Sequence, residues 1–272
     1  MQQATQPQRQ SAAGIGYLRV PGGTGYPLVL LHGIGSNAAS FTGLIAALPA
    51  ACDAVAWDAP GYGPSEPLPM AAPSPRDYAC ALAKLLDALK LQRLALVGHS
   101  LGALFAASFA AHFPERVRAL ALVSPALGYG IAAGATLPPN VQARIDEIVQ
   151  LGPKAFAAKR AGRLVADPET KPGIVAAVEA AMAAVHPDGY VQAVRALGAG
   201  KLTADAPQIA AKTIVAVGAR DQITPPANAQ TAYAALANPA GYHEIPDCGH
   251  ALPQEQPQAL ARILVSHFDG AG

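Results

Sequence analysis

The chain has 272 residues, of which 51% are hydrophobic and 14% are charged, and its formal net charge is +1. A chain of this length suits one domain with a modest insertion. The charge gives no reason to expect nucleic acid or a membrane surface as a partner. No apolar run reaches the roughly 20 residues of a membrane span. The high apolar content suits a parallel sheet that is covered on both faces.

Residues 1–14 are predicted to be a disordered leader. Residues 1–11 are polar, rich in glutamine and lack the apolar core of a secretory signal. The three cysteines, Cys52, Cys80 and Cys248, match neither a disulfide framework nor a zinc site. Such cysteines are typical of small buried side chains in a reduced compartment. We therefore expect a cytoplasmic protein without a bound metal.

Short apolar runs alternate with helical runs along most of the chain. In chain order, the apolar runs predict strands at residues 15–20, 27–31, 54–57, 93–97, 119–123, 213–217 and 242–245. The helical runs predict helices at residues 38–48, 75–89, 101–113, 226–236 and 256–268. This alternation predicts an α/β fold with a mostly parallel, doubly wound sheet and helices on both of its faces.

The alternation is interrupted between residues 125 and 207, so the core comprises residues 15–124 and 208–270. Within the interruption, helical runs are predicted at residues 141–151, 154–164, 172–185 and 189–197, separated by proline or glycine. Helices this short need a neighbour to bury their apolar faces. We therefore expect a helical insertion that packs on the core and does not fold as an independent domain.

The run Gly98-His99-Ser100-Leu101-Gly102 is a G-x-S-x-G pentapeptide between a predicted strand and a predicted helix. Glycines on both sides of the serine permit a sharp turn that would otherwise suffer a Cβ clash. The turn places Ser100 at a helix N-terminus, where free N–H groups favour developing negative charge. This context makes Ser100 the candidate nucleophile.

Two loop residues complete a candidate catalytic set. Asp221 follows the predicted strand at 213–217, and His250 follows the one at 242–245. A serine hydroxyl is a weak nucleophile until an adjacent base takes its proton, and His250 is the candidate base. Asp221 is the candidate that orients His250 and stabilises its charged form. Asp247 lies close to His250 in sequence and is the alternative acid.

The chain order Ser100, Asp221, His250 resembles that of the α/β-hydrolase fold enzymes. The upstream turn His32-Gly33-Ile34-Gly35, after a predicted strand, resembles the H-G-x-G turn of the same superfamily. The resemblance extends from about residue 15 to residue 268. It implies that the insertion is a lid and that no cofactor is needed. It also implies that the backbone N–H groups of Leu101 and Ile34 hold the oxyanion of an acyl-transfer intermediate.

The segment Gly249-His250-Ala251-Leu252-Pro253-Gln254-Glu255-Gln256-Pro257 resembles the G-H-x-x-x-x-E-x-P ending of 3-oxoadipate enol-lactonases. Such lactones carry a free carboxylate, which the planar fork of an arginine binds well. Arg160 and Arg163 in the insertion are candidates for that contact, or else solvent-facing helix charges. His99 is a third candidate for substrate contact, with a packing role as its alternative. An apolar lid face would equally suit a neutral ester.

The sequence therefore predicts a serine hydrolase that cleaves a small carboxylic ester or lactone through an acyl-enzyme on Ser100, as a monomer or homodimer. One alternative is a hydrolase of meta-cleavage ring-fission products, which breaks a C–C bond. Those enzymes usually have Trp after the histidine and Asn before the nucleophile, where this chain has Ala251 and His99. A ligand-binding protein on a hydrolase fold is a second alternative. A perhydrolase side activity would leave no mark in the sequence.

Overall fold

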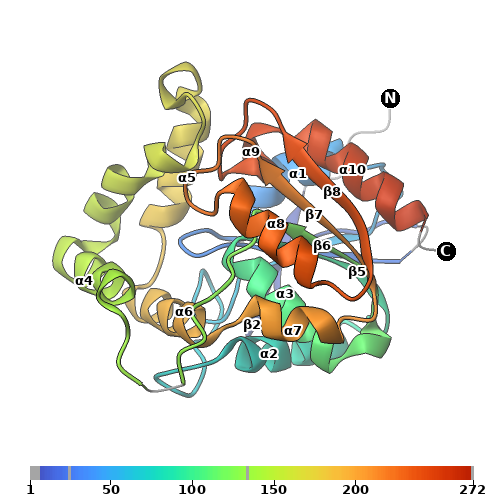
Figure 1. The fold of residues 1–272 in the computed structure, drawn as a ribbon, viewed down its shortest axis with the longest axis horizontal. Helices are drawn as coiled ribbons and strands as arrows, with labels where there is room; N and C mark the ends of the chain where they lie inside the picture. The colour runs from blue at the N-terminus through green and yellow to red at the C-terminus, as the bar shows by residue number, and fades with distance from the viewer. Residues whose placement is uncertain (1–6, 24–25, 133–134, 271–272) are drawn as a thin grey trace.

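The computed structural model describes residues 7–23, 26–132 and 135–270, and its centre is an eight-stranded sheet (Figure 1). The strand order is β1-β2-β4-β3-β5-β6-β7-β8. The strands are β1 (Gln8–Ala12), β2 (Ile15–Val20), β3 (Leu28–Leu31), β4 (Ala54–Trp57), β5 (Leu94–His99), β6 (Val117–Val123), β7 (Lys212–Gly218) and β8 (Pro239–Ile245). Strands β1, β2 and β4 pair antiparallel, and all other neighbours pair parallel.

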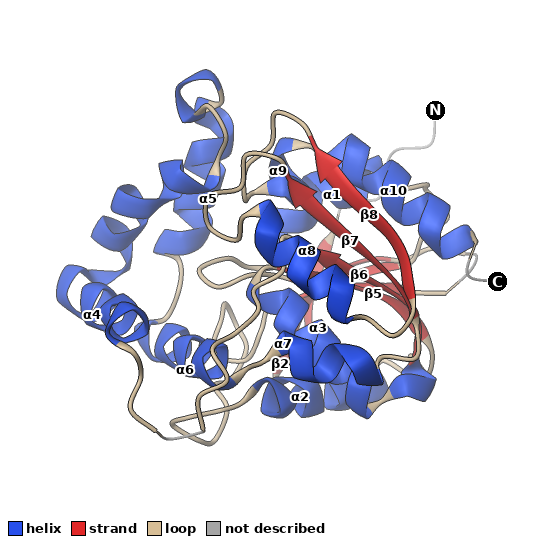
Figure 2. Cartoon of the chain, viewed as in Figure 1, coloured by secondary structure: helices blue, strands red, loops and turns tan. Residues whose placement is uncertain are grey.

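Helices cover both faces of this sheet, as the sequence predicted (Figure 2). One face packs on α2 (Pro75–Ala88), α3 (Leu101–His112) and α8 (Pro226–Ala235). The other packs on η1 (Ala38–Phe41), α1 (Thr42–Ala47), α9 (Leu252–Glu255) and α10 (Pro257–Asp269). Alternate strand residues serve the two cores, because side chains of a strand point to opposite faces. Val29 lies in the first core and Leu30 in the second.

The register of the parallel strands brings their carboxyl ends to one edge of the sheet. Gly98 at the end of β5 pairs with Leu31 of β3 and with Leu122 of β6. The loops that follow these strands therefore meet beside Ser100. Ligands of open α/β sheets bind outside the carboxyl ends of the strands.

The N-terminal expectation was wrong for part of its range. Residues 1–6 lie outside the described residues, but Gln8–Ala12 forms β1 and pairs antiparallel with β2. The hairpin turns at Ala13 and Gly14, both of which have positive φ, as a two-residue hairpin turn requires. The strand is polar because it lies at the sheet edge with an exposed surface, so apolar periodicity could not reveal it.

The insertion, called the lid below, comprises residues 125–207 and gathers α4, α5 and α6 on the side of the molecule opposite both termini (Figure 1). Its elements are α4 (Pro139–Arg160), η3 (Ala161–Leu164), η4 (Pro168–Thr170), α5 (Pro172–Ala183), α6 (Pro187–Ala199), α7 (Leu202–Asp205) and the start of η5 (Ala206–Gln208). The two runs predicted at 141–151 and 154–164 form one kinked element, α4, which ends at Arg160. Gly152 makes the kink with a φ of 71°.

The two ends of the lid are bonded to each other, and several lid residues are bonded to the core, among them Gln192, whose side chain donates to the carbonyls of Leu68 and Met70. Where it begins and ends, its chains lie side by side, and the N–H groups of Gly130 and Leu202 donate to the carbonyls of Gly200 and Leu127. At its middle, the N–H of Ala251 donates to the carbonyl of Leu164 over 2.9 Å. Within the described part of the chain, no helix is both long and apolar enough to cross a membrane.

Candidate active site

Ser100 occupies a strained turn between β5 and α3. Its φ of 55° and ψ of −116° are unfavourable for a residue with a Cβ, and such strain often marks functional sites. A Cβ at Gly98 would lie 2.3 Å from the carbonyl oxygen of Gly102, and one at Gly102 would lie 2.1 Å from that of Leu31. The glycines are therefore required by the tightness of the turn, as the pentapeptide indicated.

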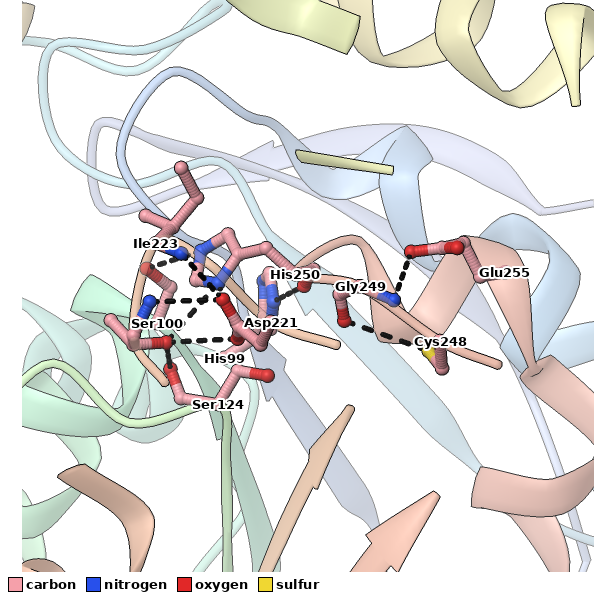
Figure 3. Close-up of polar contacts among 10 residues, drawn as sticks. His99, Ser100, Ser124, Asp221, Ile223, Cys248, Gly249, His250 and Glu255 are labelled. Carbon is pink, nitrogen blue, oxygen red and sulfur yellow. Dashed lines mark hydrogen bonds and ion pairs between the residues drawn. The ribbon is translucent and has the colours of Figure 1, made fainter. Parts of the chain in front are cut away.

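The fold brings Ser100, His250 and Asp221 together from three separate loops (Figure 3). Ser100 Oγ lies 3.0 Å from His250 Nε2, and His250 Nδ1 lies 2.8 Å from Asp221 Oδ2. The distances fit a hydroxyl that donates to one ring nitrogen while the other ring nitrogen donates to the carboxylate. The alternative acid, Asp247, has an exposed side chain, and its carbonyl accepts from Lys171.

Asp221 is held in its ionised form. Its Oδ1 accepts from the N–H groups of Ile223 and Thr224 at 2.8 and 2.9 Å. Burial alone would raise the pKa of this carboxyl, but the charge of a protonated His250 and these hydrogen bonds outweigh burial and lower the pKa. The carboxylate is thus suited to orient His250 and to stabilise an imidazolium.

The two predicted oxyanion donors lie beside the nucleophile. Ile34 and Leu101 line the same cavity as Ser100. Leu101 is the first residue of α3, where N–H groups have no partner within the helix. A Cβ on Gly33 would lie only 2.8 Å from the Cβ of Ser100, so the glycine lets the Ile34 loop approach the serine.

His32 links the loop that carries Ile34 to the segment after β4. Its Nδ1–H donates to the carbonyl of Gly33 over 2.8 Å, and its Nε2 accepts from the N–H of Ala59 over 3.0 Å. Burial lowers the pKa of His32, so the ring stays neutral and satisfies both contacts. Both ring nitrogens are occupied in structural bonds.

His99 contacts residues 246–251, the loop between β8 and α9 that carries His250 and is called the histidine loop below. Its Nε2–H donates to the carbonyl of His250 over 2.8 Å. Burial and the neighbouring His250 lower the pKa of His99 to about 3, so it is neutral at physiological pH. Among the described residues, His99 lines a smaller neighbouring cavity together with Ile34 and His250 and not the main one. Its bond to the His250 carbonyl fits the packing role, and contact with a substrate stays a prediction.

A cavity of about 410 Å³ opens between the sheet edge and the lid, with Ser100 and His250 in its wall. Three lid arginines reach it: Arg144, Arg160 and Arg163. Its apolar wall consists of Ile34, Leu101, Ala126, Leu127, Phe156, Leu164, Met182, Leu197 and Ile223. A polar rim is formed by Tyr129, Tyr190, Gln222, Thr224 and Asn228. The cavity is large enough for a small organic molecule.

The three arginines differ in their partners. Arg160 donates from Nε to Glu147 over 2.7 Å and lies 4.8 Å from the centre of the Phe156 ring. Its charge is therefore already compensated by a carboxylate. Within the described residues, Arg144 and Arg163 form no ion pair. Arg144, which sequence reasoning missed, is brought to the cavity by the packing of α4 on α6.

Thr224 was also missed by sequence reasoning, although it follows Asp221 by only three residues. Its hydroxyl lies 3.1 Å from Asp221 Oδ2, 3.1 Å from His250 Nδ1 and 2.9 Å from the carbonyl oxygen of Ser124. A threonine in a loop carries no signal of its own. Its place beside the candidate acid and base depends on how that loop folds back.

A buried glutamate links the His250 loop to the lid. Glu255, the glutamate of the G-H-x-x-x-x-E-x-P ending, is fully buried and accepts from the N–H of Gly249 over 2.9 Å (Figure 3). It also accepts from Ala166 and Lys171 of the lid. Among the described residues, no three His, Cys, Asp or Glu side chains converge as metal ligands do.

The family model of the α/β hydrolase fold matches residues 26–257, and the chain belongs to this family. The eight-stranded, mostly parallel sheet described above agrees with this family assignment. The resemblance inferred from the motifs is thereby confirmed at the level of the family.

Three individual proteins are similar to this chain over different lengths. The chain is 29% identical over 253 residues to a pimeloyl-[acyl-carrier protein] methyl ester esterase of Chromobacterium violaceum, which covers 91% of this chain and 96% of that protein. It is 26% identical over 254 residues to a 2-hydroxy-6-oxo-2,4-heptadienoate hydrolase of Pseudomonas putida, covering 89% and 88%. An uncharacterised protein of Mycobacterium tuberculosis is 36% identical over 138 residues, and the match spans only 38% of that protein.

Among solved structures, the enol-lactonase of Burkholderia xenovorans superposes with a TM-score of 0.84 over 96% of this chain and 100% of that one. The sequence identity is 22%, so this likeness concerns the fold.

Proposed function

We propose that this protein hydrolyses a small carboxylic ester or lactone through an acyl-enzyme on Ser100. The observation that carries the proposal is the continuous chain from Ser100 Oγ through His250 to Asp221 in the wall of a cavity of about 410 Å³. A nucleophile, a base and an orienting carboxylate within hydrogen-bond reach are what acyl transfer requires. The esterase relative from C. violaceum supports the same reaction class.

The reaction proceeds in two halves. His250 Nε2 takes the Ser100 proton as Oγ attacks the substrate carbonyl, and the N–H groups of Leu101 and Ile34 hold the resulting oxyanion. The imidazolium returns the proton to the leaving oxygen as the C–O bond breaks. Water then gives a proton to His250 as it attacks the acyl carbon, and the imidazolium returns that proton to Ser100 Oγ as the acyl–oxygen bond breaks and the acid leaves. Asp221 stays ionised throughout and stabilises the imidazolium.

The charges in the cavity favour a substrate with a free carboxylate. Arg144 and Arg163 reach the cavity without an ion-pair partner among the described residues, and no carboxylate side chain lines it. A guanidinium binds a carboxylate through two parallel hydrogen bonds. The apolar wall accommodates the remaining carbon skeleton. An enol-lactone with a carboxylate side chain fits both parts.

A C–C bond hydrolase that uses the same three residues is the second candidate, and the P. putida relative favours it. Ala251 after the histidine and His99 before the nucleophile count against it, because such enzymes usually have Trp and Asn at these positions. Here the His99 ring donates to the carbonyl of His250.

The test is a kinetic panel with the wild type, Ser100→Ala and the control Ser266→Ala, whose serine is exposed on α10. The panel holds p-nitrophenyl esters, a carboxylate-bearing enol-lactone and a ring-fission dienoate. We expect the lactone to give the highest kcat/KM and Ser100→Ala to lose activity by several orders of magnitude. A dienoate that is turned over in preference to every ester moves the reaction to C–C hydrolysis. Unchanged activity of Ser100→Ala overturns the role of the serine.

Labelling by a fluorophosphonate separates an enzyme from a binding protein on the same fold. We expect the wild type and Ser266→Ala to be labelled at Ser100 and Ser100→Ala to remain unlabelled. A wild type that is neither labelled nor active on the panel would point to a ligand-binding protein instead.

A further inference from the structure

The hydroxyl of Thr224 lies where the candidate acid and base meet. Thr224 is buried, with 6% of its surface exposed, in the loop between β7 and α8. Its Oγ1 is 3.1 Å from both His250 Nδ1 and Asp221 Oδ2, the two atoms that share the 2.8 Å contact. The hydroxyl therefore stands beside both ends of the Asp221–His250 hydrogen bond.

Counting protons fixes the direction of these contacts. A hydroxyl has one proton to donate and two lone pairs that accept. Two groups near Thr224 Oγ1 can only accept, the carbonyl oxygen of Ser124 at 2.9 Å and Asp221 Oδ2 at 3.1 Å, and we assign the single hydroxyl proton to the shorter contact, with Ser124. His250 Nδ1 carries a proton that it shares with Asp221. A lone pair of the hydroxyl consequently faces the Nδ1–H.

The main chain keeps the hydroxyl in this orientation. Ser124 directly follows β6 with a φ of 45°, and its N–H donates to the carbonyl of Ala216 over 2.7 Å, which fixes the Ser124 peptide against β7. The N–H of Thr224 donates to Asp221 Oδ1 over 2.9 Å. Both ends of the contact are thus tied to backbone, and the side chain has little freedom to turn away.

We propose that Thr224 is a positioning residue for the hydrolysis proposed above, on which this inference rests: its hydroxyl is a second acceptor for the His250 Nδ1–H. Two acceptors stabilise the imidazolium that forms when Ser100 loses its proton, and they hold the ring in line with Ser100. Asp221 supplies the negative charge for this, and Thr224 supplies a neutral dipole that is already aligned before the reaction.

The charged and titratable groups around His250 come from four directions. Asp221 faces Nδ1 from the β7 loop, and His99 contacts the His250 carbonyl from β5. Arg144, Arg160 and Arg163 line the same cavity from the lid, and Glu255 binds the neighbouring Gly249 from α9. Among the described residues, the partners of Nδ1 itself are Asp221 and Thr224.

The variant Thr224→Val removes the hydroxyl, keeps the side-chain volume and leaves the backbone bond to Asp221 intact. We expect its kcat/KM to fall by about fivefold to tenfold, the usual effect of one lost hydrogen bond. Because the imidazolium loses an acceptor, the acid limb of the kcat/KM profile should move to lower pH. Thr224→Ser keeps the hydroxyl and should restore both values.

Thr213→Val is the matched control. Thr213 is equally buried, at the start of β7, and its hydroxyl donates to the carbonyl of Ala211 over 2.9 Å. This variant also loses one buried hydrogen bond from a threonine to a carbonyl, so it reports how such a loss affects stability alone. The acid limb of its kcat/KM profile should stay at the pH of the wild type. If Thr224→Val does not fold, Thr224→Ala removes the same hydroxyl without the risk of a clash.

Proton NMR of the free protein gives a readout that needs no substrate. The low-field signal of the His250 Nδ1–H should move upfield and exchange faster in Thr224→Val, and both effects should be absent from Thr213→Val and Thr224→Ser. An unchanged signal, or an acid limb that stays or moves to higher pH, overturns the assignment. A wild type that is inactive on the panel but shows this NMR difference refutes the proposed function and leaves the contact standing.

Discussion

The guanidinium of Arg9 in β1 pairs with the carboxylate of Asp58, which is fully buried next to the loop that carries Ile34. The other oxygen of Asp58 accepts from the N–H of Ala38 over 2.9 Å, and the next residue, Ala59, donates to His32. An N-terminal strand that sequence analysis took for a disordered leader thus supplies the counter-ion for a carboxylate beside the Ile34 loop.

We therefore expect Arg9→Gln to destabilise the protein. Loss of the partner leaves a buried carboxylate uncompensated, but Arg9 is 44% exposed and water screens the pair, so the expected loss is about 1–2 kcal/mol. Urea unfolding measures it. Arg262→Gln, a change at an exposed arginine of α10, is the control and should stay within about 0.5 kcal/mol of the wild type. Equal stabilities of the two variants would show that Asp58 does not depend on Arg9.

Arg163 and Arg160 should differ in their effect on substrate binding. Arg163→Gln is expected to raise KM about tenfold for a carboxylate-bearing lactone and to leave KM for a neutral p-nitrophenyl ester unchanged. Arg160→Gln should have the smaller effect, because Glu147 already binds that guanidinium. Initial rates with both substrates measure the split. An equal rise in KM for the two substrates would mean that Arg163 shapes the cavity and does not bind the anion.

Because the pKa of Asp221 is lowered in the folded protein, we expect the protein to lose stability in acid. The pKa of this carboxyl is lower in the folded than in the unfolded protein. Its contribution to the free energy of unfolding is therefore fully present above the unfolded-state pKa of about 3.9, and it is lost as the pH falls through the folded-state pKa. Between about pH 5 and pH 2, the wild type should lose more free energy of unfolding than Asp221→Asn. Asp146→Asn, at an exposed position of α4, should behave as the wild type. Parallel curves for Asp221→Asn and the wild type would contradict the lowered pKa.

Glu255 should couple the lid to the histidine loop. Its two oxygens accept from Gly249 on one side and from Ala166 and Lys171 on the other. Glu255→Gln turns one acceptor into a donor that faces an N–H, so we expect kcat to fall about tenfold. Hydrogen exchange should quicken at both Gly249 and Ala166. Glu244→Gln, an exposed change on β8, is the control. Faster exchange on one side alone would show that the two loops move independently.

The sequence predicted the fold because its strands are short apolar runs and its elbow glycines have no substitute. The proximity of Ser100, Asp221 and His250 could also be predicted from the sequence. Each of them follows a strand whose carboxyl end lies at one edge of the sheet. These predictions use local signals and one rule of topology. Strand β1 was not predicted because a polar edge strand has no such local signal. Its pairing with β2 is a contact that only the folded chain displays.

The cavity wall was predicted less well, for a different reason. Arg160 meets Glu147 because α4 bends at Gly152, which brings together residues 13 positions apart that a straight helix would separate. The presence of Arg144 in the cavity wall and the bond of His99 to the His250 carbonyl likewise depend on packing between elements. Residue spacing within one element carries no information on such contacts.

Residues near the two ends of the lid hydrogen-bond to each other, Leu127 with Leu202 and Gly130 with Gly200, so the two ends of the insertion lie side by side. A segment inserted in this way is free to change in length and composition without displacing β6 or β7 and hence without disturbing Ser100, Asp221 or His250. The sequence of this closed loop is therefore constrained by its own bonds to the core, those of Leu164 and Lys171 to the histidine loop and those of Gln192 to Leu68 and Met70.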